Sequence, residues 1–111
     1  MTAVLDAERV RALNDILRRT LSGGTLVLTA GIIALGRERQ QVILDAVAAF
    51  DRFNADNDPY GEHDFGAVEV ANERVFWKID YFDRSGRYAS PDPADASVTT
   101  RILTVMLAGE Y

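Results

Sequence analysis

The sequence predicts an α+β domain in which about three helices pack on one face of a small antiparallel sheet. The chain has 111 residues, 48% hydrophobic and 26% charged, as expected of one globular domain. Helical periodicity dominates its first half, and strand-like runs follow. No repeat or low-complexity segment divides the chain, so we expect residues 1–111 to fold as a single domain.

The first element is a helix predicted over residues 6–21, because apolar residues recur there at helical spacing. Asp6 can cap its start, and the glycines at 23 and 24 end it. Its apolar stripe consists of Val10, Leu13, Leu17 and Leu21, with Ile16 beside it. We expect the arginines on the opposite face to be solvated: Arg9, Arg11, Arg18 and Arg19.

A short strand and a second long helix are predicted next. Residues 25–29 are β-branched and aliphatic, as in a strand, and residues 30–36 suit a single helical turn. Residues 37–53 carry the clearest helical pattern of the chain. The apolar stripe of this helix consists of Ile43, Ala46, Val47, Phe50 and Phe53.

A polar loop over residues 54–62 leads into a predicted β-hairpin over residues 63–82. Its strands cover 63–71 and 74–82 and are joined near Asn72-Glu73. That register makes the cross-strand pairs Phe65 with Asp80, His63 with Phe82 and Val68 with Trp77. The core face then consists of Val68, Val70, Val75, Trp77 and Ile79. The other face carries His63, Glu69, Lys78 and Asp80 among Phe65, Phe76 and Phe82.

The last element is predicted to be a helix over residues 93–108. Asp92 can cap it, Pro93 suits its first position, and Asp95 favours the positive helix start. Its interior holds many β-branched residues, which lower helix propensity, so a strand over this segment stays the alternative. The free end of such a helix could pack in a homodimer.

Composition excludes several classes of protein. The chain has no cysteine, which removes disulfides and thiolate metal sites. Its net charge is −5, which disfavours direct binding to nucleic acid. Neither a signal peptide nor a membrane span is apparent, and we expect a cytoplasmic protein without a cofactor.

One face of the hairpin offers the best candidate for chemistry. His63 and Asp80 are predicted to be diagonal neighbours there, together with Glu69 and Lys78. An imidazole, two carboxylates and an amine could carry out acid–base or metal chemistry. The structural alternative is cross-strand pairing of Lys78 with Glu69 or Asp80, with His63 simply hydrogen-bonded. Because no known catalytic spacing is present, an enzyme is the less favoured class.

The segment from Asp56 to Gly66 is the second candidate. Its acidic residues partly follow a calcium-loop pattern, but Ala67 stands where that pattern needs a bidentate Glu. Neighbours in a strand point to opposite faces, so Glu62, His63 and Asp64 cannot all hold one ion unless the backbone bends. We therefore expect no metal site, and a loop shaped by Asx turns is the structural alternative. The residues predicted to bind a partner are Asp56, Asp58, Tyr60, Glu62, His63, Asp64 and Tyr88.

Several longer motifs resemble a bacterial family, the domain of unknown function 3768. They are Gly61-Glu62-His63-Asp64-Phe65-Gly66, Phe76-Trp77-Lys78-Ile79-Asp80-Tyr81, Ser90-Pro91-Asp92-Pro93-Ala94-Asp95 and Thr99-Thr100-Arg101-Ile102-Leu103-Thr104-Val105-Met106-Leu107. The resemblance extends from about residue 12 to the end of the chain. It implies a small uncharacterised protein of the kind often encoded near plasmid or integrative-element genes, and it implies no catalytic residues.

Two functions follow as hypotheses. The favoured one is a small acidic interaction or regulatory protein that binds a protein partner, such as an anti-defence inhibitor of a CRISPR or restriction enzyme. The alternative is a small metal-dependent or acid–base hydrolase that uses a His63/Asp80 site.

Overall fold

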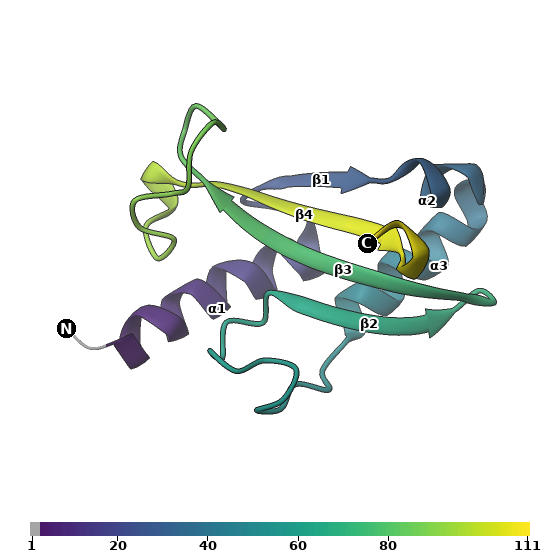
Figure 1. Cartoon of the computed structure of the whole chain (residues 1–111), viewed down its shortest axis with the longest axis horizontal. Helices are drawn as coiled ribbons and strands as arrows, with labels where there is room; N and C mark the ends of the chain where they lie inside the picture. Colours follow the sequence, from purple (N-terminus) through teal and green to yellow (C-terminus); the bar gives the residue numbers. More distant parts are fainter. Residues whose placement is uncertain (1–2) are drawn as a thin grey trace.

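A four-stranded sheet forms the centre of the computed structural model, which describes residues 3–111 (Figure 1). The strand order is β1-β4-β3-β2; β1 lies parallel to β4, and the other two pairings are antiparallel. The strands are β1 (Thr25–Leu28), β2 (Phe65–Val70), β3 (Glu73–Phe82) and β4 (Thr100–Leu107). The predicted α+β class is confirmed, with a sheet that is mixed rather than purely antiparallel.

Three α-helices accompany the sheet: α1 (Ala3–Thr20), α2 (Ala30–Ala34) and α3 (Arg37–Ala49). In Figure 1, α1 and α3 lie behind the sheet and cover one of its faces. The short α2 follows β1 and matches the single helical turn predicted over 30–36. The helix α3 ends four residues earlier than predicted, because Phe50 adopts the extended ψ of 130°.

The segment predicted to be the last helix is instead the strand β4. Asp92, Pro93 and Asp95, which were expected to start a helix, are followed only by a 3-10 turn, Ala96–Val98. There the Asp95 side chain accepts from the Ser97 N–H. After it, burial alternates along the strand, with Arg101, Leu103 and Val105 facing the helices. The β-branched alternation therefore outweighs the cap residues. A homodimer through a last helix loses its basis, because the chain ends in a second 3-10 turn, Ala108–Glu110.

The hairpin between β2 and β3 turns one residue earlier than predicted. The turn residues are Ala71 and Asn72, with φ of 57° and 63°, so that Val70 pairs with Glu73 and Phe65 with Lys78. Each partner is therefore shifted by two residues. Because strand side chains alternate with a period of two, this shift leaves every hairpin side chain within the strands on its predicted face.

The helix-facing side of the sheet carries the core. The fully buried residues that pack together are Leu17, Ile32, Ile43, Val47, Val75, Trp77, Ile79, Leu103 and Val105. Gly66 is needed here, because a Cβ at this position would lie 2.4 Å from the indole nitrogen of Trp77. Two residues of the predicted α1 stripe are largely outside this core: Ile16 is 49% exposed and Leu21 43%.

Arg18 corrects the prediction of a solvated arginine face. Its side chain is buried, and its Nη1 donates to the carbonyl oxygens of Val47 and Phe50 at 2.8 Å each and of Ala48 at 3.1 Å. These carbonyls lie at the C-terminal end of α3, where the helical hydrogen bonds run out, and the Val47 carbonyl also accepts from the Phe50 N–H at 3.3 Å. Arg18 therefore joins α1 to α3 from within the core.

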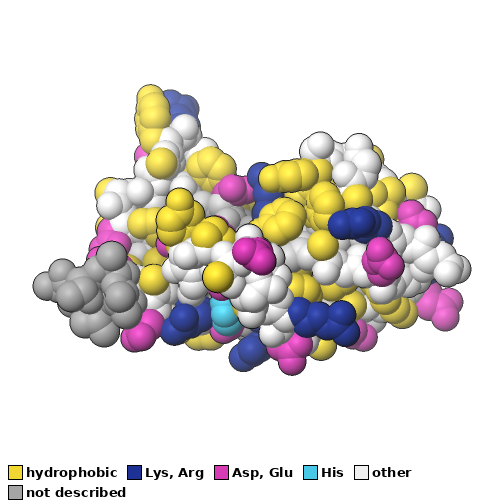
Figure 2. Space-filling view, turned by 60° about the horizontal axis from the view of Figure 1, so that its bottom comes forward, with side chains coloured by type: hydrophobic (Ala, Val, Ile, Leu, Met, Phe, Trp, Pro, Cys, Tyr) yellow, Lys and Arg dark blue, Asp and Glu magenta, His cyan; other side chains and the backbone are white. Residues whose placement is uncertain are grey.

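The opposite side of the sheet is covered by none of the α-helices that the structure describes, and we call it the open face (Figure 1). Its members alternate with core residues along the strands: Thr25, Val27, Phe65, Ala67, Glu69, Arg74, Phe76, Lys78, Asp80, Phe82, Thr100, Ile102, Thr104 and Met106. Figure 2 turns the β2 edge toward the reader and shows hydrophobic side chains interspersed with basic and acidic ones.

Candidate functional site

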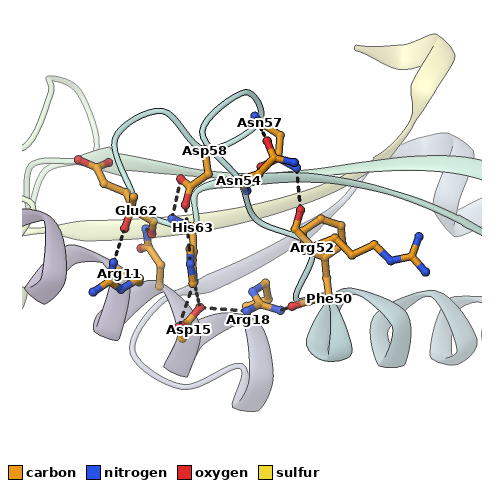
Figure 3. Close-up of polar contacts among 12 residues, drawn as sticks. Arg11, Asp15, Arg18, Phe50, Arg52, Asn54, Asn57, Asp58, Glu62 and His63 are labelled. Carbon is orange, nitrogen blue, oxygen red and sulfur yellow. Dashed lines mark hydrogen bonds and ion pairs between the residues drawn. The ribbon is translucent and has the colours of Figure 1, made fainter.

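His63 ends the loop that precedes β2, and it contacts α1 rather than the open face (Figure 3). Its φ of 55° lies in the left-handed region, which takes its side chain out of the strand pattern. The ring Nδ1 is 2.9 Å from Asp15 Oδ1 and 3.2 Å from Oδ2. The ring also stacks on Phe53, with centroids 3.6 Å apart and planes 5° from parallel.

Asp15 is the centre of this cluster, because it also accepts a hydrogen bond from Arg18 Nη2 at 2.9 Å (Figure 3). Burial raises the pKa of the Asp15 carboxyl, but the hydrogen bonds from His63 and Arg18 outweigh it, so the pKa is lowered overall. Asp15 therefore holds its negative charge between two donors. We call Asp15, Arg18, Asp58 and His63 the His63 cluster.

Asp58 closes the cluster from the loop side. Its Oδ1 accepts from the His63 backbone N–H at 3.1 Å, and its Oδ2 lies 3.7 Å from His63 Nε2. Both ring nitrogens of His63 thus face carboxylates, Nδ1 within hydrogen-bond distance of Asp15 and Nε2 at the longer distance of 3.7 Å from Asp58. The geometry is that of an anchor, which ties the loop over residues 50–64 to α1 through buried and half-buried charge pairs.

The predicted site of His63 with Asp80 is wrong. Asp80 lies on the open face, where its Oδ2 is 2.7 Å from Lys78 Nζ. The two candidates are on opposite sides of the sheet, because β2 begins at Phe65 and His63 does not continue its alternation. Glu69 is exposed on β2, and its cross-strand partner is Arg74. The four candidate catalytic residues are therefore not brought together.

Between residues 54 and 57 the loop is shaped by its own asparagines (Figure 3). Asn54 Oδ1 accepts from the N–H groups of Asp56 and Asn57, and Asn57 Oδ1 accepts from the Asn54 N–H. These are Asx-type turns, as the structural alternative expected. The Asp56 side chain has no part in them and is exposed.

A second polar network, which sequence reasoning missed, lies beside the first. Asn14 Nδ2 donates to Tyr81 Oη at 2.8 Å, and Tyr81 donates to Glu62 Oε1 at 3.0 Å. Arg101, only 2% exposed, donates from Nε to Asn14 Oδ1 at 2.7 Å and also to the Pro93 carbonyl. Burial lowers the pKa of Arg101 and raises that of Glu62. The sequence does indicate that Asn14 is buried, because it falls four residues after Val10 and three before Leu17, on the buried side of α1.

The predicted binding residues do not form one surface. Asp58 and His63 belong to the anchor, and Tyr88 lies 71% exposed on the distant loop between β3 and β4. Tyr60 and Glu62 line a groove of about 330 Å³ beside the start of α1. The pKa of half-buried Asp64 is raised by burial and by nearby carboxylates.

Neither a cluster of metal ligands nor a membrane-spanning helix is found in the part of the chain that the structure describes. No three His, Asp or Glu side chains within residues 3–111 are placed so that they could share a metal ion. In the same range, no helix is both long and apolar enough to cross a membrane.

Comparison with known families gives one match. The model of the family described as protein of unknown function (DUF3768) matches residues 28–110. The chain belongs to this family. The resemblance predicted from the sequence motifs is therefore confirmed. No curated protein and no solved structure matches this DUF3768 chain. The match covers β2, β3 and β4 but only the last residue of β1, Leu28, and Asp15 and Arg18 of the His63 cluster precede it.

Proposed function

We propose that this DUF3768 protein is a non-enzymatic binding protein that attaches to a protein partner through its open face. The observation that carries the proposal is a sheet surface rich in aromatic and aliphatic side chains that none of the described α-helices covers. Soluble domains rarely leave a contiguous apolar surface without a use, and such surfaces mark interaction sites.

An aromatic cluster dominates one end of the open face. The Phe65 and Phe76 rings lie 5.5 Å apart, and Tyr111 packs on both at 5.8 and 5.5 Å. Tyr111 stays 73% exposed, so the cluster can contact a second molecule. Aromatic anchors of this kind supply most of the binding free energy at protein interfaces.

The charges on the open face are matched, and Glu69 lies opposite Arg74 in the strand register. Lys78 and Asp80 pair at 2.7 Å near its middle, and the guanidinium of Arg74 lies 5.6 Å from the Phe76 ring. Matched charges within an apolar surface add little repulsion against a partner and help to set its orientation. The face therefore combines aromatic and aliphatic side chains with matched charges, a mixture that is common at protein interfaces.

The charge of the chain supports a basic partner. At −5 the protein repels its own copies and is attracted to positively charged surfaces. Enzymes that process nucleic acid carry such surfaces, because they must neutralise phosphates. The proposal therefore includes an anti-defence role, in which the protein covers the basic channel of a CRISPR or restriction enzyme.

Hydrolysis at His63 and Asp80 is not proposed for this fold. The reaction would need both side chains at one substrate, and they lie on opposite sides of the sheet. The imidazole is held between Asp15 and Asp58, which suits a structural role.

Comparative capture tests the proposal. Tagged wild type and the variant Phe76→Thr are used to capture proteins from a bacterial lysate, and a captured protein is then purified and its affinity measured directly. Threonine keeps the strand preference while it removes aromatic surface. We expect the variant to lose at least about 1 kcal/mol of binding free energy, the usual threshold for an interface anchor.

The matched control is Val42→Thr, which removes exposed apolar surface from α3, on the other side of the sheet. It should leave the affinity unchanged. The proposal fails if Phe76→Thr binds as tightly as wild type, or if the open face proves to be covered by a second copy in solution.

A further inference from the structure

A groove with an apolar floor lies at the end of the molecule where α1 begins. It has a volume of about 330 Å³ and is separate from the open face. Its walls come from α1, the turn at residues 60–62 and the turn at residues 92–94. Its apolar surface is contributed by Ala7, Val10, Tyr60, Pro93 and Ala94.

Three carboxylates line the same groove: Asp6, Glu62 and Asp92. They come from segments far apart in the sequence, and only Glu62 has a partner in the polar network behind the groove. The Tyr81 hydroxyl donates to Glu62 at 3.0 Å and fixes its position. The turn itself is held from α1, where Arg11 donates to the Gly61 carbonyl at 3.2 Å. The groove is thus built by the fold before any ligand arrives.

We propose that this groove takes a cationic side chain, an arginine or a lysine, from a basic segment of the protein partner. The long aliphatic stem of such a residue fits the apolar floor, and its charged head reaches the carboxylates at the rim. Tyr60 is 76% exposed at the edge, where its ring can face the cation. Charge complementarity selects the occupant, since a neutral or acidic side chain would leave the three carboxylates without a positively charged partner.

This contact goes beyond the open face and gives the partner a second, charge-specific point of attachment. Arg101 lies against the Tyr81 ring and donates to Asn14 and the Pro93 carbonyl rather than to the carboxylates of the rim. Its charge acts on Glu62 from behind and partly offsets the rise that burial causes in the pKa of that carboxyl. Arg11 is directed to the Gly61 carbonyl. The groove therefore keeps a negative rim although basic residues are near it.

The test is an NMR titration of the full-length protein with N-acetyl-arginine methylamide and, separately, with its citrulline counterpart. Citrulline has nearly the same shape as arginine but no charge. We expect saturable shifts of the Ala7, Val10 and Ala94 amides with the arginine compound only. The variant Asp92→Asn should weaken its binding roughly two- to fivefold, as expected of one exposed ion pair.

Asp45→Asn makes the same charge change on the exposed side of α3 and should leave the titration unaltered. Equal shifts with both compounds, shifts that do not saturate, or shifts located away from the groove would overturn the proposal. A negative titration combined with loss of partner binding in Phe76→Thr would refute the groove and leave the open face standing.

Discussion

Replacing Asp15 by asparagine should separate an anchoring role of the His63 cluster from a catalytic one. The carboxylate accepts hydrogen bonds from Arg18 at 2.9 Å and from His63 at 2.9 and 3.2 Å. Asparagine has nearly the same shape, and its carbonyl oxygen can still accept, but it carries no charge. The change therefore removes the ionic part of two interactions and leaves their geometry in place.

The expected loss of stability can be worked from these contacts. A hydrogen bond to a charged group contributes about 1.5–3 kcal/mol, against about 0.5–1.5 kcal/mol for a neutral one. Two such bonds give a difference of about 2 kcal/mol, and the partial exposure of the pair reduces it. We expect Asp15→Asn to lower the free energy of unfolding by about 1–2 kcal/mol at neutral pH.

The pH dependence gives the sign of the effect. The pKa of Asp15 is lower in the folded protein than its ordinary value of 3.8. A carboxyl of this kind stabilises the fold above its unfolded pKa, and the stabilisation is lost as the pH falls through the folded pKa. The gap between wild type and variant should therefore be full at pH 7 and should shrink below about pH 4.

Urea unfolding followed by circular dichroism at pH 7 and pH 3 measures both quantities. The control Asp45→Asn removes an exposed carboxylate from α3 and should stay within about 0.5 kcal/mol of wild type. Equal stabilities of Asp15→Asn and wild type at pH 7, or a gap that widens toward pH 3, would refute the anchoring role.

Three further changes test the packing of the fold, each by urea unfolding. Gly66→Ala should destabilise by about 3 kcal/mol or more, because the new Cβ overlaps the buried ring of Trp77, whereas Gly109→Ala, with no atom within 4 Å of the new Cβ, should be nearly neutral. Leu21→Gly should stabilise the fold by about 0.5–1 kcal/mol, because Leu21 follows α1 with a φ of 59°, a conformation that favours glycine. Leu21→Ala keeps a Cβ in this conformation and should not stabilise the fold. Arg101→Met should cost about 2–5 kcal/mol, because two buried acceptors lose their donor; an unchanged stability would mean that they are solvated instead.

Local patterns were enough to predict most elements and both faces of the hairpin. Strand alternation has a period of two, so even an error in the turn position left Phe76 on the open face and Trp77 in the core. The C-terminal strand β4 was misread because Asp92, Pro93 and Asp95 are genuine helix-start residues, used here for turns.

The His63 cluster was beyond the reach of such patterns. Its central contact joins Asp15 and His63 across 48 residues of sequence. The positive φ of His63 could not be predicted either, because in the sequence only glycine marks such a conformation. Arg18 resembled its solvated neighbours, and only the packing of α1 on α3 shows that its guanidinium is buried. Long-range polar contacts of this kind depend on tertiary structure, which a single sequence does not display.

The most direct test of the central claim is cross-saturation NMR of the methyl-labelled protein bound to a purified partner. Saturation of the partner reduces the signals of methyl groups that lie in the interface. The account predicts the largest losses at open-face methyls, those of Val27, Ile102 and Thr104, with Ile33 and Val42 unaffected. Losses confined to Ile33 and Val42, with the open face silent, would contradict it.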